Sequence, residues 1–265
     1  MEAVRLDVYM HKNGLCKSRE SAKQLILNEC VYVNNKLITK PSVKVSDFDD
    51  ITIESNFEYV GRGSLKIEKA VNLFNINIEN KVAVDIGAST GGFTDFLIKN
   101  NADKVYAVDV GHDQLHETLR NNSKVVNLEG TNFRYVDASI FKEPIDLIVI
   151  DVSFISLKLL MPKISEIATQ STDIIALIKP QFEAGREKVG KNGIVKNKSV
   201  HLEVLNNINK YCEDNNLSIN NITFSPIKGG DGNIEYLAHI LKTEKRINNV
   251  ELNFKALITS AFEFL

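Results

Sequence analysis

The chain has 265 residues, of which 43% are hydrophobic and 25% are charged, which is typical of a folded globular protein and excludes a disordered one. A net charge of −2 and three widely spaced cysteines exclude a uniformly basic protein and a disulfide scaffold, and they give no metal-ligand spacing. The apolar run 145–160 is too short for a membrane helix and the chain opens without a hydrophobic signal core, so we predict a cytoplasmic protein with no membrane partner.

The first part of the chain predicts a small α+β module. Residues 5–13 and 18–28 have helical spacing, and Ser18 is a suitable N-cap for the second helix. Residues 32–38 predict a hairpin around an Asn34-Asn35 turn, because asparagine tolerates the left-handed conformation. Strands at 43–45 and 51–53 complete the module, which we assign to residues 1–58.

Basic residues are concentrated in this module. Residues 4–46 contain eight Lys or Arg against three acids, a net charge of +5, and five acids follow between residues 47 and 58. A local excess of this kind indicates a nucleic-acid footprint. The cations predicted to form this footprint are Arg5, Lys17, Arg19, Lys23, Lys36, Lys40 and Lys44.

A linker at 59–63 leads into a larger α/β domain, residues 64–265, which opens with an amphipathic helix at 64–74. From residue 82 to 178, strand-like and helical runs alternate, which predicts a Rossmann-like parallel sheet covered on both faces. The strands are expected at 82–86, 105–108, 125–128, 147–150 and 174–178, and the helices at 93–99, 114–120 and 157–167. Further on we expect a helix at 201–215, strands at 219–225 and 236–241, and a terminal helix at 250–264.

The first strand of this domain ends in a glycine-rich turn, VDIGASTGGFT at 84–94, which feeds a helix. In a doubly wound sheet this turn borders the ligand crevice, and an acid such as Asp109, after the second strand, can accept hydrogen bonds from ribose hydroxyls. A dinucleotide site prefers Gly-x-Gly-x-x-Gly, so the turn favours S-adenosylmethionine over NAD. The predicted donor-binding residues are Asp85, Gly87, Ser89, Thr90, Gly91, Gly92, Phe93 and Asp109.

Charged residues also follow the later strands directly. Asp151 comes after the fourth strand and Lys179 after the fifth, where chains leave the sheet toward the crevice. Lys66, on the preceding helix, and Glu235, just before a late strand, can point into the same region.

Several segments together resemble the TlyA family, within the FtsJ-like ribose 2′-O-methyltransferases. They are STGGFT at 89–94, DVSFIS at 151–156, KPQFE at 179–183 and GNIEY at 232–236. Residues 5–52 are similar to the S4 RNA-binding module found in that family, through RLD at 5–7, SR at 18–19, VYVN at 31–34 and KPS at 40–42. Glu29 and Asn35 depart from the glycines usual in that module.

The resemblance implies a ribosomal RNA 2′-O-methyltransferase that uses S-adenosylmethionine, with ribosomal RNA or ribosomal subunits as its partner. It implies a cytidine target in large-subunit rRNA, with small-subunit rRNA as a further target in some members. It also implies that the cations of the first module bind RNA, with RNA shape and splayed bases supplying specificity. It also implies the catalytic set Lys66, Asp151, Lys179 and Glu235. Lys179 is our choice of general base, since a nearby Lys66 and partial desolvation favour the uncharged amine. Members are often described as haemolysins, so a membrane-active toxin and a non-catalytic RNA-binding protein remain the alternatives.

Overall fold

The computed structural model describes residues 3–16, 18–27, 30–53, 59–243 and 252–265. The chain divides into two compact units, Met1–Arg62 and Gly63–Leu265. Each unit has its own core and is described by itself.

The smaller unit is an α+β module built on a thin core. Helices α1 (Leu6–Lys12) and α2 (Arg19–Leu27) pack together, and strands β3 (Lys36–Leu37), β2 (Val31–Val33) and β5 (Ile51–Ile53) form an antiparallel sheet. Strands β1 (Val4–Arg5) and β4 (Lys44–Val45) pair separately. The core consists of Leu6, Met10, Ala22, Ile26, Val31, Val33 and Val45. So few buried side chains are typical of a domain of about fifty residues.

Local predictions for this unit are largely confirmed. Asn34 and Asn35 have φ values of 51° and 62°, which is the left-handed pair that a tight hairpin between β2 and β3 needs. The Ser18 hydroxyl accepts a hydrogen bond from the Ser21 N–H at 3.1 Å, as expected of an N-cap. Residue 28, the predicted end of the second helix, and Glu29 lie outside the described residues.

The larger unit is organised around one mixed sheet. Among the described residues its strand order is β11-β12-β10-β9-β6-β7-β8. The strands are β6 (Val82–Ile86), β7 (Lys104–Val108), β8 (Val125–Leu128), β9 (Leu147–Ile150), β10 (Asp173–Ile178), β11 (Leu217–Phe224) and β12 (Tyr236–Lys242). From β8 to β10 all pairings are parallel, and β12 runs antiparallel to both β10 and β11. The Rossmann-like prediction is therefore confirmed, with an antiparallel hairpin added at one edge.

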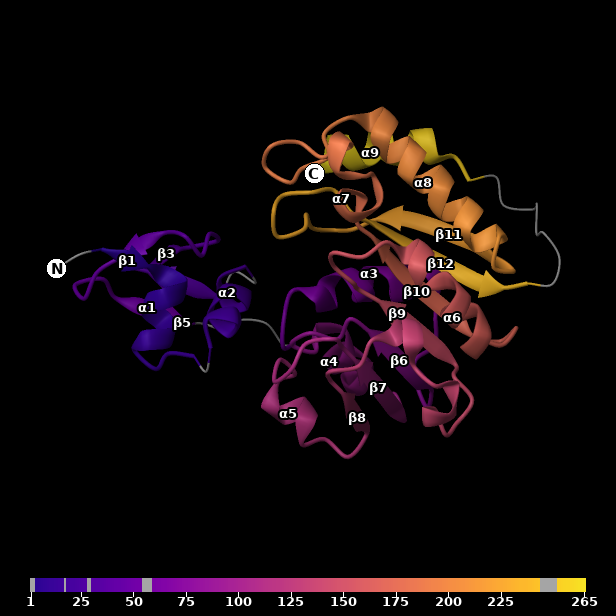
Figure 1. Cartoon of the computed structure of the whole chain (residues 1–265), viewed down its shortest axis with the longest axis horizontal. Helices are drawn as coiled ribbons and strands as arrows, with labels where there is room; N and C mark the ends of the chain where they lie inside the picture. Colours follow the sequence, from indigo (N-terminus) through magenta and orange to yellow (C-terminus); the bar gives the residue numbers. More distant parts are fainter. Residues whose placement is uncertain (1–2, 17, 28–29, 54–58, 244–251) are drawn as a thin grey trace. The chain divides into compact units, whose positions relative to one another are not determined.

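Helices cover both faces of this sheet (Figure 1). On one face lie α6 (Met161–Ile167), α8 (Lys198–Glu213) and α9 (Phe254–Phe264), whose apolar side chains join the main core. On the other, α3 (Gly63–Phe74) and α4 (Gly92–Lys99) contact each other and strands β12, β6 and β7. The described residues also form the shorter helices α5 (Glu117–Arg120) and α7 (Pro180–Glu183) and 3₁₀ turns at 133–135, 138–140, 157–159 and 186–188.

Two helix predictions differ from the structure for identifiable reasons. The helix expected at 114–120 begins only at Glu117, because His116 has a non-helical backbone (ψ 143°) and acts as the N-cap, its ring nitrogen accepting a hydrogen bond from the Thr118 N–H. The helix expected at 157–167 is divided into a 3₁₀ turn and α6, and Pro162 occupies the first turn of α6, where a missing N–H is tolerated. The terminal helix begins at Phe254, capped by Asn253, and residues 250–251 lie outside the described residues.

Candidate active site

The predicted site residues of the larger unit gather at one edge of the sheet. The strand order reverses between β6 and β9, so the connections that follow these two strands diverge, which is where doubly wound sheets bind ligands. Asp85 lies in β6, and Asp109, Asp151 and Lys179 directly follow β7, β9 and β10. All four therefore lie at or near the carboxyl edge of the parallel strands.

The glycine-rich turn between β6 and α4 is closely packed. Gly87 has a φ of 87°, and a Cβ there would lie 2.5 Å from the Asp151 carbonyl oxygen. Gly91, the N-cap of α4, has a φ of 99°, and a Cβ there would lie 2.2 Å from a methyl group of Leu119. Backbone conformation and packing thus account for both glycines, and the evidence for a ligand comes from the acids beside them.

Asp109 organises this turn. Its carboxylate accepts hydrogen bonds from the Ser89 N–H at 2.8 Å and the Gly111 N–H at 2.7 Å. A carboxylate offers about four acceptor positions, so a half-buried Asp109 can still accept ligand hydroxyl groups.

Asp85 is a buried acid with one unsatisfied oxygen. Its Oδ2 accepts a hydrogen bond from the Thr94 hydroxyl at 2.7 Å, whereas its Oδ1 has no hydrogen-bond partner among the described residues. Burial, opposed by the Thr94 hydrogen bond and reinforced by Asp151 and Asp109, raises the pKa of Asp85 to about 7. A buried, unsatisfied carboxyl group at this edge fits a ligand that brings a positive charge.

Lys66 and Glu235 form a buried ion pair across the larger unit. The Lys66 ammonium lies 2.7 Å from the Glu235 carboxylate, and the two side chains are only 11% and 2% exposed. Glu235 reaches this edge because β12 pairs antiparallel with β10, with Tyr236 opposite Ile178. The register therefore places the residue before β12 beside the residue after β10.

Lys179 and Asp151 form a second ion pair. Their charged atoms are 2.6 Å apart, and the Lys179 ammonium also donates to the Ser153 hydroxyl at 2.9 Å. Burial by itself would raise the pKa of Asp151, but the positive charges of Lys179 and Lys66 outweigh burial and lower it. Asp151 is therefore an ionised carboxylate at neutral pH.

The two ion pairs belong to one cluster. Lys66 is close enough to lower the pKa of Asp151, and the Gln181 amide approaches the Glu235 carboxylate at 3.5 Å. The structure thus brings together all four predicted catalytic residues, which come from α3, the β9 and β10 ends, and the start of β12.

Glu183 is a residue of this region to which the sequence reasoning gave no role. Its carboxylate accepts hydrogen bonds from the Ser156 hydroxyl at 2.6 Å and the Leu157 N–H at 2.8 Å. These bonds tie the segment after β10, which carries Lys179, to the segment after β9, which carries Asp151. Its acidic character within KPQFE was the available signal, but only the fold identifies its partners.

Phe154 is a second residue of this region that has no role predicted from the sequence. Its side chain is 91% exposed although its φ is 64°, a conformation that bulky residues rarely adopt. Its ring lies 5.0 Å from the ring of Phe182, and the Lys179 ammonium lies 6.0 Å from the Phe182 ring centre. A strained, exposed aromatic side chain beside an ion pair indicates a functional surface.

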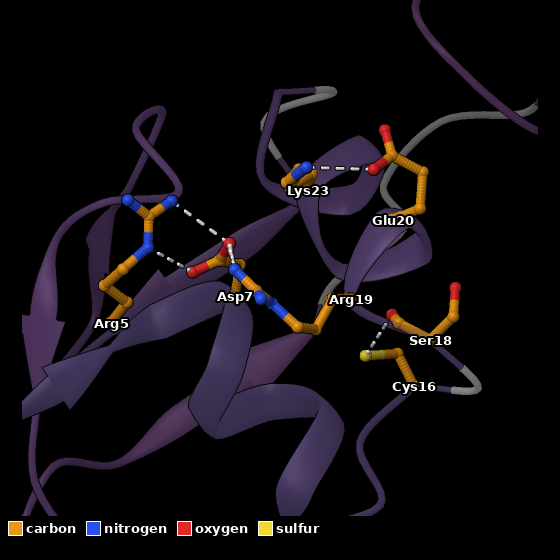
Figure 2. Close-up of polar contacts among 7 residues, drawn as sticks. All are labelled: Arg5, Asp7, Cys16, Ser18, Arg19, Glu20 and Lys23. Carbon is orange, nitrogen blue, oxygen red and sulfur yellow. Dashed lines mark hydrogen bonds and ion pairs between the residues drawn. The ribbon is translucent and has the colours of Figure 1, made fainter.

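Two of the predicted RNA-binding cations, Arg5 and Arg19, are engaged within the smaller unit (Figure 2). The Arg5 guanidinium makes two hydrogen bonds to Asp7, at 2.9 and 3.1 Å, and that of Arg19 makes one at 3.3 Å. The Arg5 hydrogen bond is the main cause of the lowered pKa of Asp7. Both arginines remain about half exposed, so their free N–H groups can still reach a phosphate.

Four further predicted RNA-binding cations are described, and they lie on the surface of this unit. Lys23 pairs with Glu20 at 2.9 Å, as Figure 2 shows. Lys36, Lys40 and Lys44 are exposed. Lys17 lies outside the described residues, so its predicted role has no structural account.

Comparison with known proteins identifies the family. A family model described as FtsJ-like methyltransferase matches residues 59–242, and one described as S4 domain matches residues 4–51. The chain belongs to the FtsJ-like methyltransferase family. The predicted enzyme class and methyltransferase fold are therefore confirmed.

Relatives of this FtsJ-like methyltransferase carry two kinds of name. It is 45% identical over 239 residues to hemolysin A of Brachyspira hyodysenteriae, covering 90% of this chain and 100% of the relative. It is 36% identical over 234 residues to the 16S/23S rRNA (cytidine-2′-O)-methyltransferase TlyA of Mycobacterium tuberculosis, covering 88% of this chain and 87% of the relative. A solved structure of a candidate hemolysin from Streptococcus thermophilus has a TM-score of 0.80 at 42% identity, covering 100% of this chain and 97% of that chain. The predicted resemblance to the TlyA family is confirmed.

The acids of the carboxyl edge fit the methyl donor of an FtsJ-like methyltransferase. S-adenosylmethionine carries positive charge and two ribose hydroxyls, which suit the unsatisfied oxygen of Asp85 and the remaining acceptor positions of Asp109. In the part of the chain that the structure describes, no three His, Cys, Asp or Glu residues are placed to hold a metal ion. The same residues include no helix that is long and apolar enough to span a membrane.

Proposed function

We propose that the chain methylates a ribose 2′-hydroxyl of ribosomal RNA, that of a cytidine in the large subunit and also in the small subunit. Residues 1–58 act as the RNA-binding domain, 59–63 as the linker and 64–265 as the catalytic domain. The observation that carries the proposal is the cluster of two ion pairs, Lys66–Glu235 and Lys179–Asp151, beside the acids Asp85 and Asp109. The name of the Mycobacterium tuberculosis relative supports the cytidine and both subunits as targets. A substrate in ribosomes also supports the predicted cytoplasmic location.

Each residue of the cluster has a distinct part in the proposed reaction. When bound, S-adenosylmethionine would supply the methyl group, and the protein would have to align the hydroxyl and remove its proton. Lys179 would accept that proton as the neutral amine, Asp151 orients Lys179, and Glu235 holds Lys66 next to them. Asp85 and Asp109 hold the donor in place.

The experiment that tests this function uses ribosomal subunits from cells that lack the gene. Purified full-length protein and S-adenosylmethionine should introduce 2′-O-methyl groups at specific cytidines, detected by mapping of alkali-resistant positions in the RNA. The same protein is tested for donor binding by calorimetry and for lysis of red cells. If the protein lyses red cells but neither binds the donor nor methylates RNA, the proposed function is wrong and a membrane-active toxin is supported instead.

Donor binding should depend on pH through Asp85. Because its pKa is raised to about 7, Asp85 is largely protonated at pH 6 and ionised at pH 8 in the donor-free protein. Only the ionised form attracts the positively charged donor, so affinity should rise by up to roughly tenfold per pH unit below pH 7 and level off above it. The stability of the fold depends on pH in the opposite direction. The free energy of unfolding that neutral Asp85 contributes is fully present below its ordinary pKa of 3.8 and is lost as pH rises through about 7.

Calorimetry between pH 5.5 and 8.5 measures this dependence for the donor. Asp85→Asn should bind the donor more weakly at pH 8 and show little change with pH. Wild-type affinity with an unchanged pH profile in Asp85→Asn would show that another group responds to pH.

Phe154 should contribute to RNA engagement and leave donor binding unchanged. We propose that the target base stacks on its exposed ring once the nucleotide leaves its helix. Stacking is worth about 1–3 kcal/mol per base, so Phe154→Ala should lower kcat/KM for ribosomal subunits by roughly 5- to 150-fold. Phe154→Tyr, which keeps the ring, should stay close to wild type, and equal activity of the alanine variant would contradict stacking.

A further inference from the structure

A second concentration of positive charge lies in the larger unit, outside the module to which the sequence reasoning assigned RNA binding. The connection 185–198 contains Arg186, Lys188, Lys191, Lys196 and Lys198 against a single acid, Glu187. The connection 226–234 adds Lys228 against Asp231. Together the two connections contain six cations and two acids.

The two connections are fixed side by side. The side chain of Asn233, fully buried, accepts from the Val195 N–H at 2.9 Å and donates to the Gly193 carbonyl at 2.8 Å. The buried His201 ring makes hydrogen bonds to the Val195 carbonyl at 2.9 Å and the Tyr236 hydroxyl at 2.8 Å. Figure 1 shows the connections between α7 and α8 and between β11 and β12 next to each other. Buried polar side chains therefore hold both connections in one arrangement.

This arrangement borders the catalytic cluster. Gly229 packs directly on the Glu235 carboxylate, since a Cβ at Gly229 would lie 2.3 Å from Oε1 of Glu235. The connection that carries Lys228 thus touches the partner of Lys66, and Asn233 links it to the connection that carries Lys191 and Lys196.

Two of these six cations interact with side chains of the protein itself. Lys188 pairs with Glu203, and the Lys198 ammonium lies 5.2 Å from the centre of the Phe262 ring. The remaining four cations are exposed: Arg186, Lys191, Lys196 and Lys228. No carboxylate of the described residues lies within ion-pair distance of these four side chains. Exposed cations held on ordered connections, with no internal counter-charge in the described structure, suit a polyanion.

We propose that Arg186, Lys191, Lys196 and Lys228 form a second RNA-binding surface, called here the two-connection surface. It binds the phosphates of the RNA strand that enters the catalytic cluster and so positions the target ribose. The inference rests on the proposed function and goes beyond it, because it gives the catalytic domain its own RNA contacts. Phosphate contacts position nucleic acid without reading its sequence, so this surface supplies placement and affinity.

The test compares two variants of the full-length protein that lose the same net charge. One is Lys191→Gln/Lys196→Gln/Lys228→Gln. The matched control is Lys142→Gln/Lys210→Gln/Lys255→Gln, whose lysines are exposed before β9, on α8 and on α9. Binding to unmodified ribosomal subunits is measured across a salt series, together with donor binding and single-turnover methylation.

The first variant should bind subunits with an affinity lower by roughly tenfold or more near 0.1 M salt. When the logarithm of its affinity is plotted against the logarithm of the salt concentration, the slope should be shallower by about 2 to 3. Its donor affinity should equal that of wild type, and the control should stay within about twofold of wild type in both measurements. Equal affinities and salt slopes for the two variants would overturn the two-connection surface. A wild-type protein that neither binds nor methylates the subunits would instead overturn the proposed function.

Discussion

Lys179→Ala is expected to lower turnover by roughly 100-fold or more, the low end for a lost general base, while the donor and ribosomal subunits still bind. The acids proposed to bind the donor, Asp85 and Asp109, lie in or directly after other strands, and the predicted RNA-binding residues lie elsewhere, so neither binding step is expected to need Lys179. Single-turnover methylation with donor and subunits saturating measures the chemical step by itself. Calorimetry and subunit binding on the same variant show whether the two binding steps are intact.

Lys179→Arg separates proton transfer from electrostatic positioning. Arginine keeps the positive charge beside Asp151 but cannot lose its proton at accessible pH. If Lys179 accepts the proton, the arginine variant should be nearly as inactive as the alanine variant. Near-wild-type single-turnover rates in Lys179→Arg would eliminate the base assignment and leave Lys179 a positioning role.

The second large effect is expected from the buried pair Lys66–Glu235. Glu235→Leu removes the counter-charge 2.7 Å from a buried ammonium, which typically costs about 3–5 kcal/mol. In a domain of this size that corresponds to a fall of roughly 10 °C in the melting temperature of the larger unit. Turnover should be lost as well, because Glu235 belongs to the proposed catalytic cluster. Differential scanning calorimetry and single-turnover methylation measure the two effects.

The double variant Lys66→Met/Glu235→Leu separates stability from catalysis. Replacing both members of a buried ion pair by apolar side chains of similar size is often neutral or stabilising, so much of the lost stability should return. Turnover should remain as low as in Glu235→Leu, since the charges themselves are absent. A stable double variant that methylates at the wild-type rate would assign the pair a purely structural role.

Local sequence determined much of this protein. Mainly apolar runs of four or five residues predicted the parallel strands, because fully buried strands need side chains that suit both covered faces. The turn at Asn34-Asn35, the glycine-rich turn with glycines at 87 and 91, and the positions of the acids or lysine directly after β7, β9 and β10 could be predicted. Each of these features depends on the local backbone or on its place at a strand end. The S4 module and the FtsJ-like domain were identified from motifs that are contiguous in the chain.

Only the tertiary structure decided which of these residues meet. Lys66 and Glu235 are 169 positions apart, and they pair because β12 returns antiparallel beside β10 while α3 packs against β12. Arg5 and Arg19 contact the buried Asp7, a partner that a count of charges does not reveal. The exposed ring of Phe154 and the joining of Lys191 and Lys228 to one surface likewise depend on the fold. The physical reason is that local sequence sets backbone conformation and which strands are buried, whereas hydrogen bonds and ion pairs between distant segments form only when strand order and register bring them together.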